Sequence, residues 1–68
     1  MEISAMIGRR VADYRAKEDI SQKSFARGCG ISSRYLSRLE NGKANPSLRV
    51  LENISAQMHI TLTDLLRY

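Results

Sequence analysis

Four short segments of this chain each begin with a serine or threonine that precedes apolar residues at helical spacing. These four residues are Ser21, Ser32, Ser47 and Thr61. A hydroxyl at such a position caps a helix, because it accepts a hydrogen bond from a backbone N–H group of the first turn. No segment alternates apolar and polar residues for long, so β-strands are not expected. Together with an apolar face near the N-terminus, the four caps predict an all-α domain of five short helices.

The first two predicted helices differ in length. The first runs from about Ser4 to Lys17, and the polar run 17–19 ends it. Its apolar face consists of Ile3, Ile7, Val11 and Tyr14. The second helix follows Ser21, is short, and ends at the run Gly28–Cys29–Gly30, because glycine tolerates the left-handed conformation of a helix end.

The remaining three helices are delimited in the same way. The third covers residues 32–40, and Asn41–Gly42 ends it, before a turn over residues 43–46. The fourth follows Ser47. The fifth follows Thr61, and Asp64 completes a capping-box pattern three residues later. The apolar residues expected to face the core from these helices are Leu36, Leu39, Leu48, Leu51, Ile54, Met58, Leu62, Leu65 and Leu66.

The basic residues are concentrated in the middle of the chain, which has a net charge of +4. Residues 21–49 hold six lysines and arginines and a single acidic residue, Glu40, whereas the rest holds five basic and six acidic residues. A basic segment in a nearly neutral frame favours a polyanionic partner such as nucleic acid. From charge alone, the alternative is an ordinary solvated surface with a basic bias.

The numbers of cysteine and histidine residues limit the cellular compartment and the metal sites that this chain could have. With one cysteine, Cys29, the chain forms no internal disulfide, which indicates a reducing compartment such as the cytoplasm. Cys29 and the single histidine, His59, cannot build a zinc site, and His59 is expected to cap a helix end. No acid–base pair, activated nucleophile or phosphate loop points to an enzyme, so neither catalysis nor a cofactor is expected. Neither a signal peptide nor a membrane-spanning run is expected.

The second and third predicted helices form the unit that carries function. Two short helices joined by a tight turn with glycine are typical of a helix-turn-helix. Gly30 is expected to take the left-handed conformation in this turn, and Ala26 is small because the helices cross closely beside it. Four hydrogen-bonding residues share the outer face of the third helix, namely Ser33, Arg34, Ser37 and Arg38. Such side chains suit the base edges of a DNA major groove.

Three groups of residues give the chain a specific resemblance. They are Ser21-Gln22 with Ala26 and Gly30-Ile31-Ser32, then Leu36-Ser37-Arg38-Leu39-Glu40-Asn41-Gly42-Lys43, then Asn45-Pro46-Ser47-Leu48. In this spacing the sequence resembles the Cro/repressor-type helix-turn-helix family from Ile7 to Leu66. The resemblance implies one compact, five-helix, lambda-repressor-like DNA-binding domain over residues 1–68, with the helix-turn-helix at about 21–40. The chain departs from the family at Ser24, where an acidic residue is common, and at His59, where glycine or asparagine is common.

Members of that family are mostly transcriptional repressors of phages, plasmids and bacterial chromosomes, and they include restriction–modification controller proteins and antitoxins. The pair Arg34-Tyr35 is similar to the controller subgroup. The resemblance implies a sequence-specific DNA-binding transcriptional regulator in a bacterial or phage-encoded, cytoplasmic setting. It would bind a pseudo-palindromic DNA operator as a homodimer and repress transcription. Activation of transcription is the alternative, and no membrane partner is expected. The alternative function is an antitoxin-like protein-interaction module whose DNA binding serves autoregulation.

The resemblance also implies roles for individual residues. Ser33, Arg34 and Arg38 would read bases, and either arginine could grip a guanine. Ser37 shares their face but could instead bond back to its own helix. The DNA backbone would be held by Gln22, Lys23, Ser32, Tyr35, Asn41 and Lys43. Tyr35 could instead lie partly buried, and Arg15 would pair with Glu40 to join the first helix to the third.

A chain that stops at Tyr68 is expected to dimerise through its own last helix. The candidate interface residues are Ile60, Leu62, Leu66 and Tyr68. Two protomers about a two-fold axis would read half-sites about 34 Å apart. The alternative is that these residues close the core of a monomer. RNA is not the expected nucleic acid, because the few aromatic residues are not arrayed for base stacking.

Overall fold

Each predicted cap is present in the computed structural model, which describes residues 3–67. The side-chain oxygens of Ser21, Ser32, Ser47 and Thr61 accept hydrogen bonds from the backbone N–H groups three residues later, at 3.0, 3.0, 3.2 and 3.0 Å. They begin α2 (Gln22–Cys29), α3 (Ser33–Glu40), α4 (Leu48–Gln57) and α5 (Leu62–Leu66), which follow α1 (Ile3–Glu18). Residues 3–67 contain no strand, so the expectation of an all-α fold with five helices is confirmed.

The predicted helix ends are also confirmed. Gly30 and Gly42 take the left-handed conformation after α2 and α3, with φ angles of 73° and 71°. His59 has a φ of 59° after α4, as expected of a capping residue. Asp19, the last residue of the polar run, closes α1 with a φ of 57°. Each of the first four helices therefore stops within two residues of a left-handed backbone.

The core lies between the helices and takes fully buried side chains from all of them. Val11 of α1, Leu36 and Leu39 of α3, Ile54 of α4 and Leu65 of α5 have no exposed surface. From α2, Phe25 is buried, and its ring meets that of the half-buried Tyr14 edge to face, with the centroids 6.2 Å apart. Most of the predicted apolar faces therefore pack as expected.

Two residues predicted to face the core are instead exposed. Leu48 is 62% exposed and Ile3 is 45% exposed. Each is the first residue of its helix, so it lies at a helix end beyond the stretch that neighbouring helices cover. Helical spacing assigns a residue to a face, but it does not determine where the packed part of that face begins.

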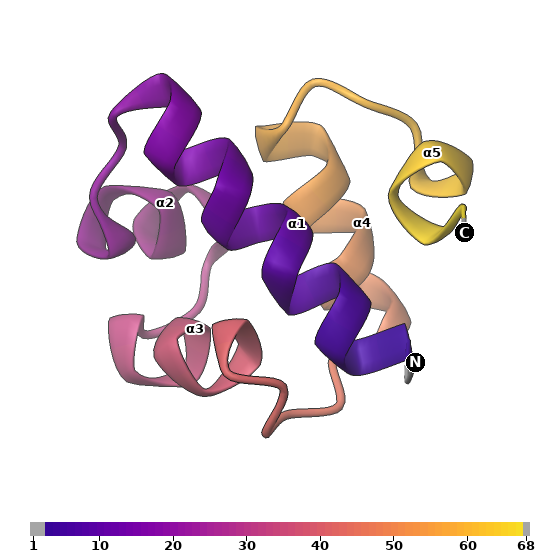
Figure 1. Cartoon of the computed structure of the whole chain (residues 1–68), viewed down its shortest axis with the longest axis horizontal. Coiled ribbons are helices and arrows are strands. Elements are labelled where there is room, and N and C mark those ends of the chain that lie inside the picture. The colour runs from indigo at the N-terminus through magenta and orange to yellow at the C-terminus, as the bar shows by residue number, and fades with distance from the viewer. Residues whose placement is uncertain (1–2, 68) are drawn as a thin grey trace.

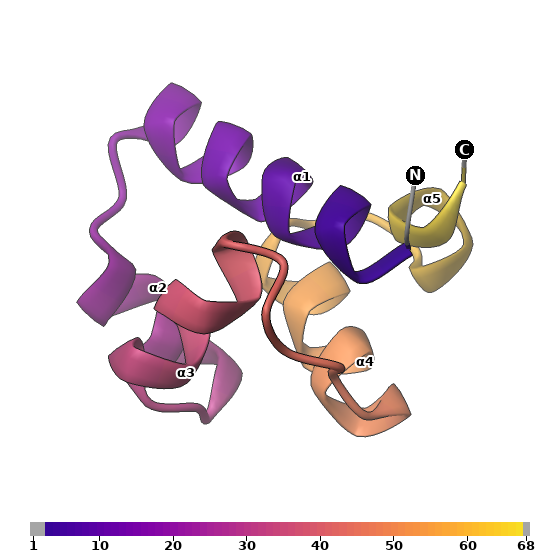
Figure 2. The same ribbon diagram turned by 60° about the horizontal axis from the view of Figure 1, so that its bottom comes forward.

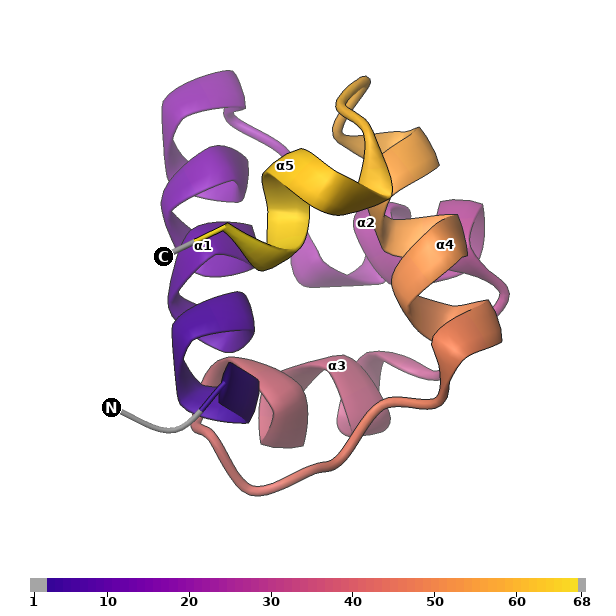
Figure 3. The same ribbon diagram turned by 90° about the vertical axis from the view of Figure 1, so that its right-hand side faces the viewer.

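The long helix α1 connects two separate parts of the molecule. It packs against α3 and against α5 (Figure 1), whereas α2 packs against α3 and α4. With the lower side turned forward, α3 lies beside the loop that leads into α4 (Figure 2). From the side, α3 crosses below and α5 above, along the same helix α1 (Figure 3). Within residues 3–67, no helix has both the length and the apolar character to cross a membrane.

Candidate nucleic-acid interface

The turn between α2 and α3 is set by the backbone of Gly30. Its N–H donates to the carbonyl of Arg27 at 3.2 Å, and the N–H of Ile31 donates to the carbonyl of Ala26 at 3.0 Å. These bonds satisfy carbonyls that a helix end would otherwise leave unpaired. A Cβ added at Gly30 would meet no atom within 4 Å, so glycine is required by the φ of 73° alone. Ala26 is buried beside the turn, as predicted.

Helix α3 separates its side chains into an inner and an outer face. Leu36 and Leu39 are fully buried and fix the helix to the core. The four residues predicted to read bases lie away from them: Ser33, Arg34 and Arg38 are exposed, and Ser37 is half-buried. Tyr35 is half-buried as well, which agrees with the second of the two predicted alternatives and leaves its DNA contact a prediction. One exposed strip of a short, capped helix thus gathers two guanidinium groups and two hydroxyls.

The C-terminal end of α3 is closed by its own polar groups. The Asn41 side chain donates from Nδ2 to the Ser37 carbonyl at 2.9 Å. The N–H of Lys43 donates to the Arg38 carbonyl at 2.9 Å, and Nη2 of Arg38 donates to the Lys43 carbonyl at 2.8 Å. The guanidinium group of Arg38 is therefore held against the loop that follows α3. The Arg34 side chain is exposed and makes no hydrogen bond or ion pair with residues 3–67.

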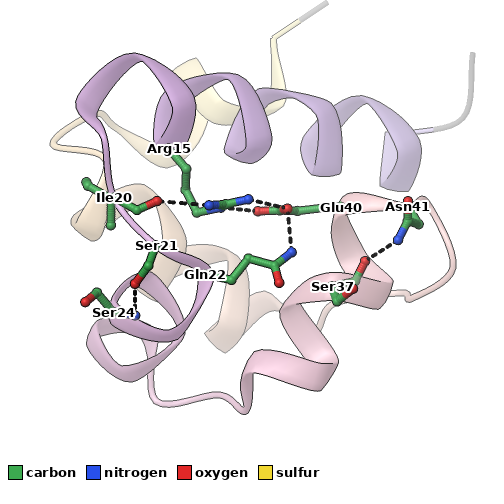
Figure 4. Close-up of polar contacts among 8 residues, drawn as sticks. All are labelled: Arg15, Ile20, Ser21, Gln22, Ser24, Ser37, Glu40 and Asn41. Atoms are coloured by element: carbon green, nitrogen blue, oxygen red, sulfur yellow. Dashed lines mark hydrogen bonds and ion pairs between the residues drawn. The ribbon is translucent and has the colours of Figure 1, made fainter.

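A three-residue network ties α3 to the two preceding helices (Figure 4). Arg15 donates from Nε and Nη2 to the two carboxylate oxygens of Glu40, at 2.6 and 2.9 Å. Its Nη1 donates to the Ile20 carbonyl at 2.9 Å, which also fixes the loop before α2. Gln22, the first residue of α2, donates from Nε2 to Glu40 at 2.9 Å. The expected pairing of Arg15 with Glu40 is present, and Gln22 joins it.

The protonation states of this network follow from its geometry. The Arg15 and Glu40 side chains are only 19% and 8% exposed. Burial acts to raise the pKa of Glu40, but the hydrogen bonds from Arg15 and Gln22 outweigh it and hold that pKa below its ordinary value. The hydrogen bond to Glu40 raises the pKa of Arg15, and it outweighs desolvation, which lowers that pKa. Both groups are therefore charged at neutral pH, and the ion pair is complete.

The Gln22 contact was not foreseen from the sequence. The residue was expected to bind a DNA phosphate, but its amide nitrogen is engaged inside the protein in this structure. Its backbone N–H lies at the N-terminal end of α2, where a helix leaves such groups unpaired. Because Glu40 lies far along the chain from Gln22, no local pattern indicates the bond between them.

Basic side chains outside the interface are largely neutralised within the protein. Arg9 pairs with Asp13 at 3.4 Å, Arg67 pairs with Asp64 at 3.0 Å, and Arg15 pairs with Glu40. By contrast, the six basic residues of the middle segment make no ion pair with residues 3–67, and all six are exposed. They are Lys23, Arg27, Arg34, Arg38, Lys43 and Arg49. Arg10 and Lys17 of α1 also make no ion pair with residues 3–67, but most of the unneutralised charge comes from α2, α3, the loop after α3 and the start of α4.

Two further contacts support the interface from α1. Ser4 donates from its hydroxyl to Oδ1 of Asn45 at 2.8 Å, which fastens the loop after α3 to the start of α1. Gly8 lies so close to α3 that an added Cβ would stand 2.0 Å from the Leu39 carbonyl oxygen. Sequence reasoning assigned neither contact. A glycine inside an apolar helical face is the one signal that could have indicated such a close approach.

The predicted dimer residues are only partly exposed. Ile60 is 36% exposed, whereas Leu62 and Leu66 are half-buried and pack against the core. Tyr68 lies outside the described residues. Cys29 is buried, and burial raises the pKa of its thiol to about 11. Residues 3–67 bring no three potential metal ligands together.

Comparison with known proteins places this fold in a family. The helix-turn-helix family HTH_3 matches residues 11–65. The control protein C.MunI of Mycoplasma sp is 43% identical over 65 residues, which cover 94% of this chain and 88% of C.MunI. The HTH-type transcriptional regulator SinR of Bacillus subtilis is 37% identical over 62 residues, which cover 90% of this chain and 56% of SinR.

Solved structures agree with the sequence comparison. The chain superposes on the biofilm regulator SinR in complex with DNA with a TM-score of 0.78 at 34% identity, over 88% of this chain and 97% of that one. The restriction-modification controller protein C.AhdI from Aeromonas hydrophila gives a TM-score of 0.83 over 91% of this chain and 94% of that one, and at 24% identity it shows the fold alone. The predicted resemblance is therefore confirmed, and the chain belongs to the helix-turn-helix family.

Proposed function

We propose that residues 1–68 form one DNA-binding domain that regulates transcription by binding an operator as a homodimer. The exposed strip of α3 enters a major groove, where Arg34 and Arg38 bond to guanine acceptors and Ser33 and Ser37 contact neighbouring base edges. The regulator acts in the cytoplasm and represses by covering the site that RNA polymerase uses. It is a DNA-binding protein rather than an enzyme.

The segregation of charge is the observation that carries this proposal. The six exposed basic residues of segment 21–49 make no ion pair with residues 3–67, and they come from the elements that flank and include α3. An exposed cation without a partner adds little to folding, whereas opposite a phosphate it releases a counterion and strengthens binding. Lys23 and Lys43 lie on either side of α3 in the chain, and they suit phosphates on either side of the groove.

Phosphate contacts also explain how the reading helix would be held in register. The backbone N–H groups at the start of α2 and the side chains of Ser32, Tyr35 and Asn41 are the proposed positioning contacts. Gln22 can take part through its backbone N–H while its side-chain amide nitrogen stays on Glu40. The bond from Gln22 to Glu40 ties α2 to α3, and the ion pair of Arg15 with Glu40 ties α3 to α1. This network therefore fixes the phosphate-binding helix relative to the reading helix.

Homodimer formation is proposed through the surface of α5 and the turn before it. Ile60 is the most exposed apolar residue described there, and Leu62 and Leu66 present their remaining surface beside it. Tyr68, the fourth proposed interface residue, lies outside the described residues. Because one protomer reads only a few base pairs, two copies across a two-fold axis give the specificity that regulation needs.

Footprinting on the DNA upstream of the protein's own gene tests the proposal. We expect two protected half-sites whose centres lie about 34 Å apart, one helical turn of DNA. Affinity should fall by about a thousandfold or more between 50 and 200 mM salt if six or more phosphates are contacted. Binding without preference over unrelated DNA, or one isolated half-site, would contradict a sequence-specific homodimer.

A further inference from the structure

Arg10 makes an unusual contact for a residue in the middle of α1. Its Nη1 donates to the backbone carbonyls of Leu65 at 2.7 Å and Asp64 at 3.2 Å, in the last turn of α5. Its neighbour Arg9 is exposed and pairs with Asp13 on the same helix. Two adjacent arginines therefore have different partners, and only Arg10 connects α1 to the C-terminal end of the chain.

Helix α5 depends on such outside support. It has five residues, far fewer than a helix needs to be stable alone. At its C-terminal end the Asp64 carbonyl accepts the Arg67 N–H at 3.4 Å, whereas the Leu65 carbonyl has no backbone partner among residues 3–67. A cation beside such a carbonyl is favoured by the helix dipole. The Thr61 cap, the fully buried Leu65 and the Arg10 guanidinium hold the helix from three sides. Of these three, Arg10 is the one that bonds to carbonyls at the C-terminal end.

The same helix α1 also fixes the position of α3. Five residues after Arg10, Arg15 grips Glu40 at the end of α3, and Gly8 lies directly against the Leu39 carbonyl. One continuous helix thus bonds to the reading helix through Arg15 and to the last helix through Arg10. The distance between the DNA-reading surface and the α5 surface is set along α1 (Figure 3).

We propose that Arg10 is a positioning residue that sets the half-site spacing this protein accepts. This inference rests on the proposed homodimer, in which α5 meets its copy. If Arg10 no longer holds α5, the two reading helices remain intact, but their separation is no longer fixed. The protein then binds single half-sites normally and loses its preference for one spacing between them.

The test uses Arg10→Met, which keeps most of the aliphatic stem and removes the donors, with Arg9→Met as the matched control. The DNA is a duplex that the wild-type protein selects from random sequence, together with versions that carry one base pair more or fewer at the centre. One base pair changes the separation by about 3.4 Å and the rotation by about 35°. The wild-type protein and Arg9→Met should prefer the selected spacing by at least about tenfold, a difference of ~1.4 kcal/mol.

For Arg10→Met, we expect that preference to fall below about threefold, while affinity for a duplex with one half-site stays within about twofold of wild type. A general loss of structure would lower half-site affinity as well, so the two readouts separate positioning from stability. If Arg10→Met does not fold, Arg10→Gln replaces it, because the shorter amide lacks the reach and the fork of the guanidinium. A variant that keeps the wild-type spacing preference would overturn the role of Arg10 alone. A wild-type protein without any spacing preference would overturn the homodimer, and this inference with it.

Discussion

Glu40, the last residue of α3, is gripped by the guanidinium of Arg15 through two hydrogen bonds, at 2.6 and 2.9 Å. The pair is mostly withdrawn from water, with side-chain exposures of 19% and 8%. A third bond from Gln22 brings α2 into the same network. The angle between the two helices of the helix-turn-helix is therefore fixed by a charged contact outside the turn itself, as well as by Gly30 within it.

Removing one member of this pair should destabilise the fold strongly. In Glu40→Ala, the Arg15 charge stays in a half-buried position without its partner, which typically destabilises by about 3 kcal/mol. Chemical denaturation followed by circular dichroism measures the loss. The exposed pair of Arg9 with Asp13 supplies the control, because Asp13→Asn should change stability by less than about 1 kcal/mol. Equal effects of the two substitutions would refute the structural importance assigned to Glu40.

The free energy of unfolding should also fall at acidic pH, because Glu40 becomes protonated. Its pKa in the folded protein is depressed, so it contributes stability that is complete above the ordinary glutamate pKa of about 4.3 and is lost as the pH falls through the lower, folded value. In Glu40→Gln this contribution is absent at every pH. The difference in unfolding free energy between wild type and Glu40→Gln should therefore shrink as the pH drops from 7 toward 3. A constant difference over that range would mean that Glu40 is not the titrating group.

A single methyl group at Gly8 should separate α1 from α3. Its added Cβ would lie 2.0 Å from the Leu39 carbonyl oxygen, a backbone atom that moves only with its helix. Overpacking of this kind typically destabilises by about 1–3 kcal/mol. Gly28→Ala is the matched control, because the Cβ there would meet only the end of the Gln57 side chain, which can turn away. Alanine also favours a helix over glycine by about 1 kcal/mol, so Gly28→Ala should be nearly neutral or stabilising by thermal unfolding.

Local signals predicted the helices better than they predicted the contacts between them. The caps at Ser21, Ser32, Ser47 and Thr61 act over three residues, so each can be recognised within its own segment. The exposure of Leu48 could not be predicted from a local signal, because this exposure depends on where the neighbouring helices end. The link between Arg15 and Glu40 came from resemblance to a family, since no spacing rule connects residues so far apart.

Contacts of side chains with backbone carbonyls outside their own helix leave no pattern in the sequence. Arg10 bonds to two carbonyls of α5, and Arg38 bonds to the carbonyl of Lys43. Every residue has a backbone carbonyl that can accept a hydrogen bond. The amino-acid type at the accepting position therefore does not indicate that an arginine will bond there. Of the proposed DNA-contact residues, the outer strip of α3 was predictable from helical spacing, whereas the anchoring of Arg38 and Gln22 required the three-dimensional structure.

Lys43 should contribute affinity without sequence preference. It is exposed in the loop after α3, and only its carbonyl is needed to hold Arg38, so Lys43→Ala removes the charge and keeps that bond. We expect weaker binding to all DNA sequences alike, with the slope of log affinity against log salt reduced by about one unit. Fluorescence anisotropy at several salt concentrations measures this slope. A loss confined to the operator would assign base reading to Lys43 instead of phosphate contact.

Reading of DNA sequence by the outer strip of α3 is tested most directly by operator discrimination in Arg38→Ala. The quantity to measure is the ratio of affinities for the operator and for a scrambled duplex, at fixed salt. Loss of one bidentate contact to a base should lower this ratio by about tenfold or more. Arg27→Ala, which removes a charge that is also exposed but lies on α2, should leave the ratio unchanged. An unchanged ratio for Arg38→Ala as well would contradict the assignment of the reading face.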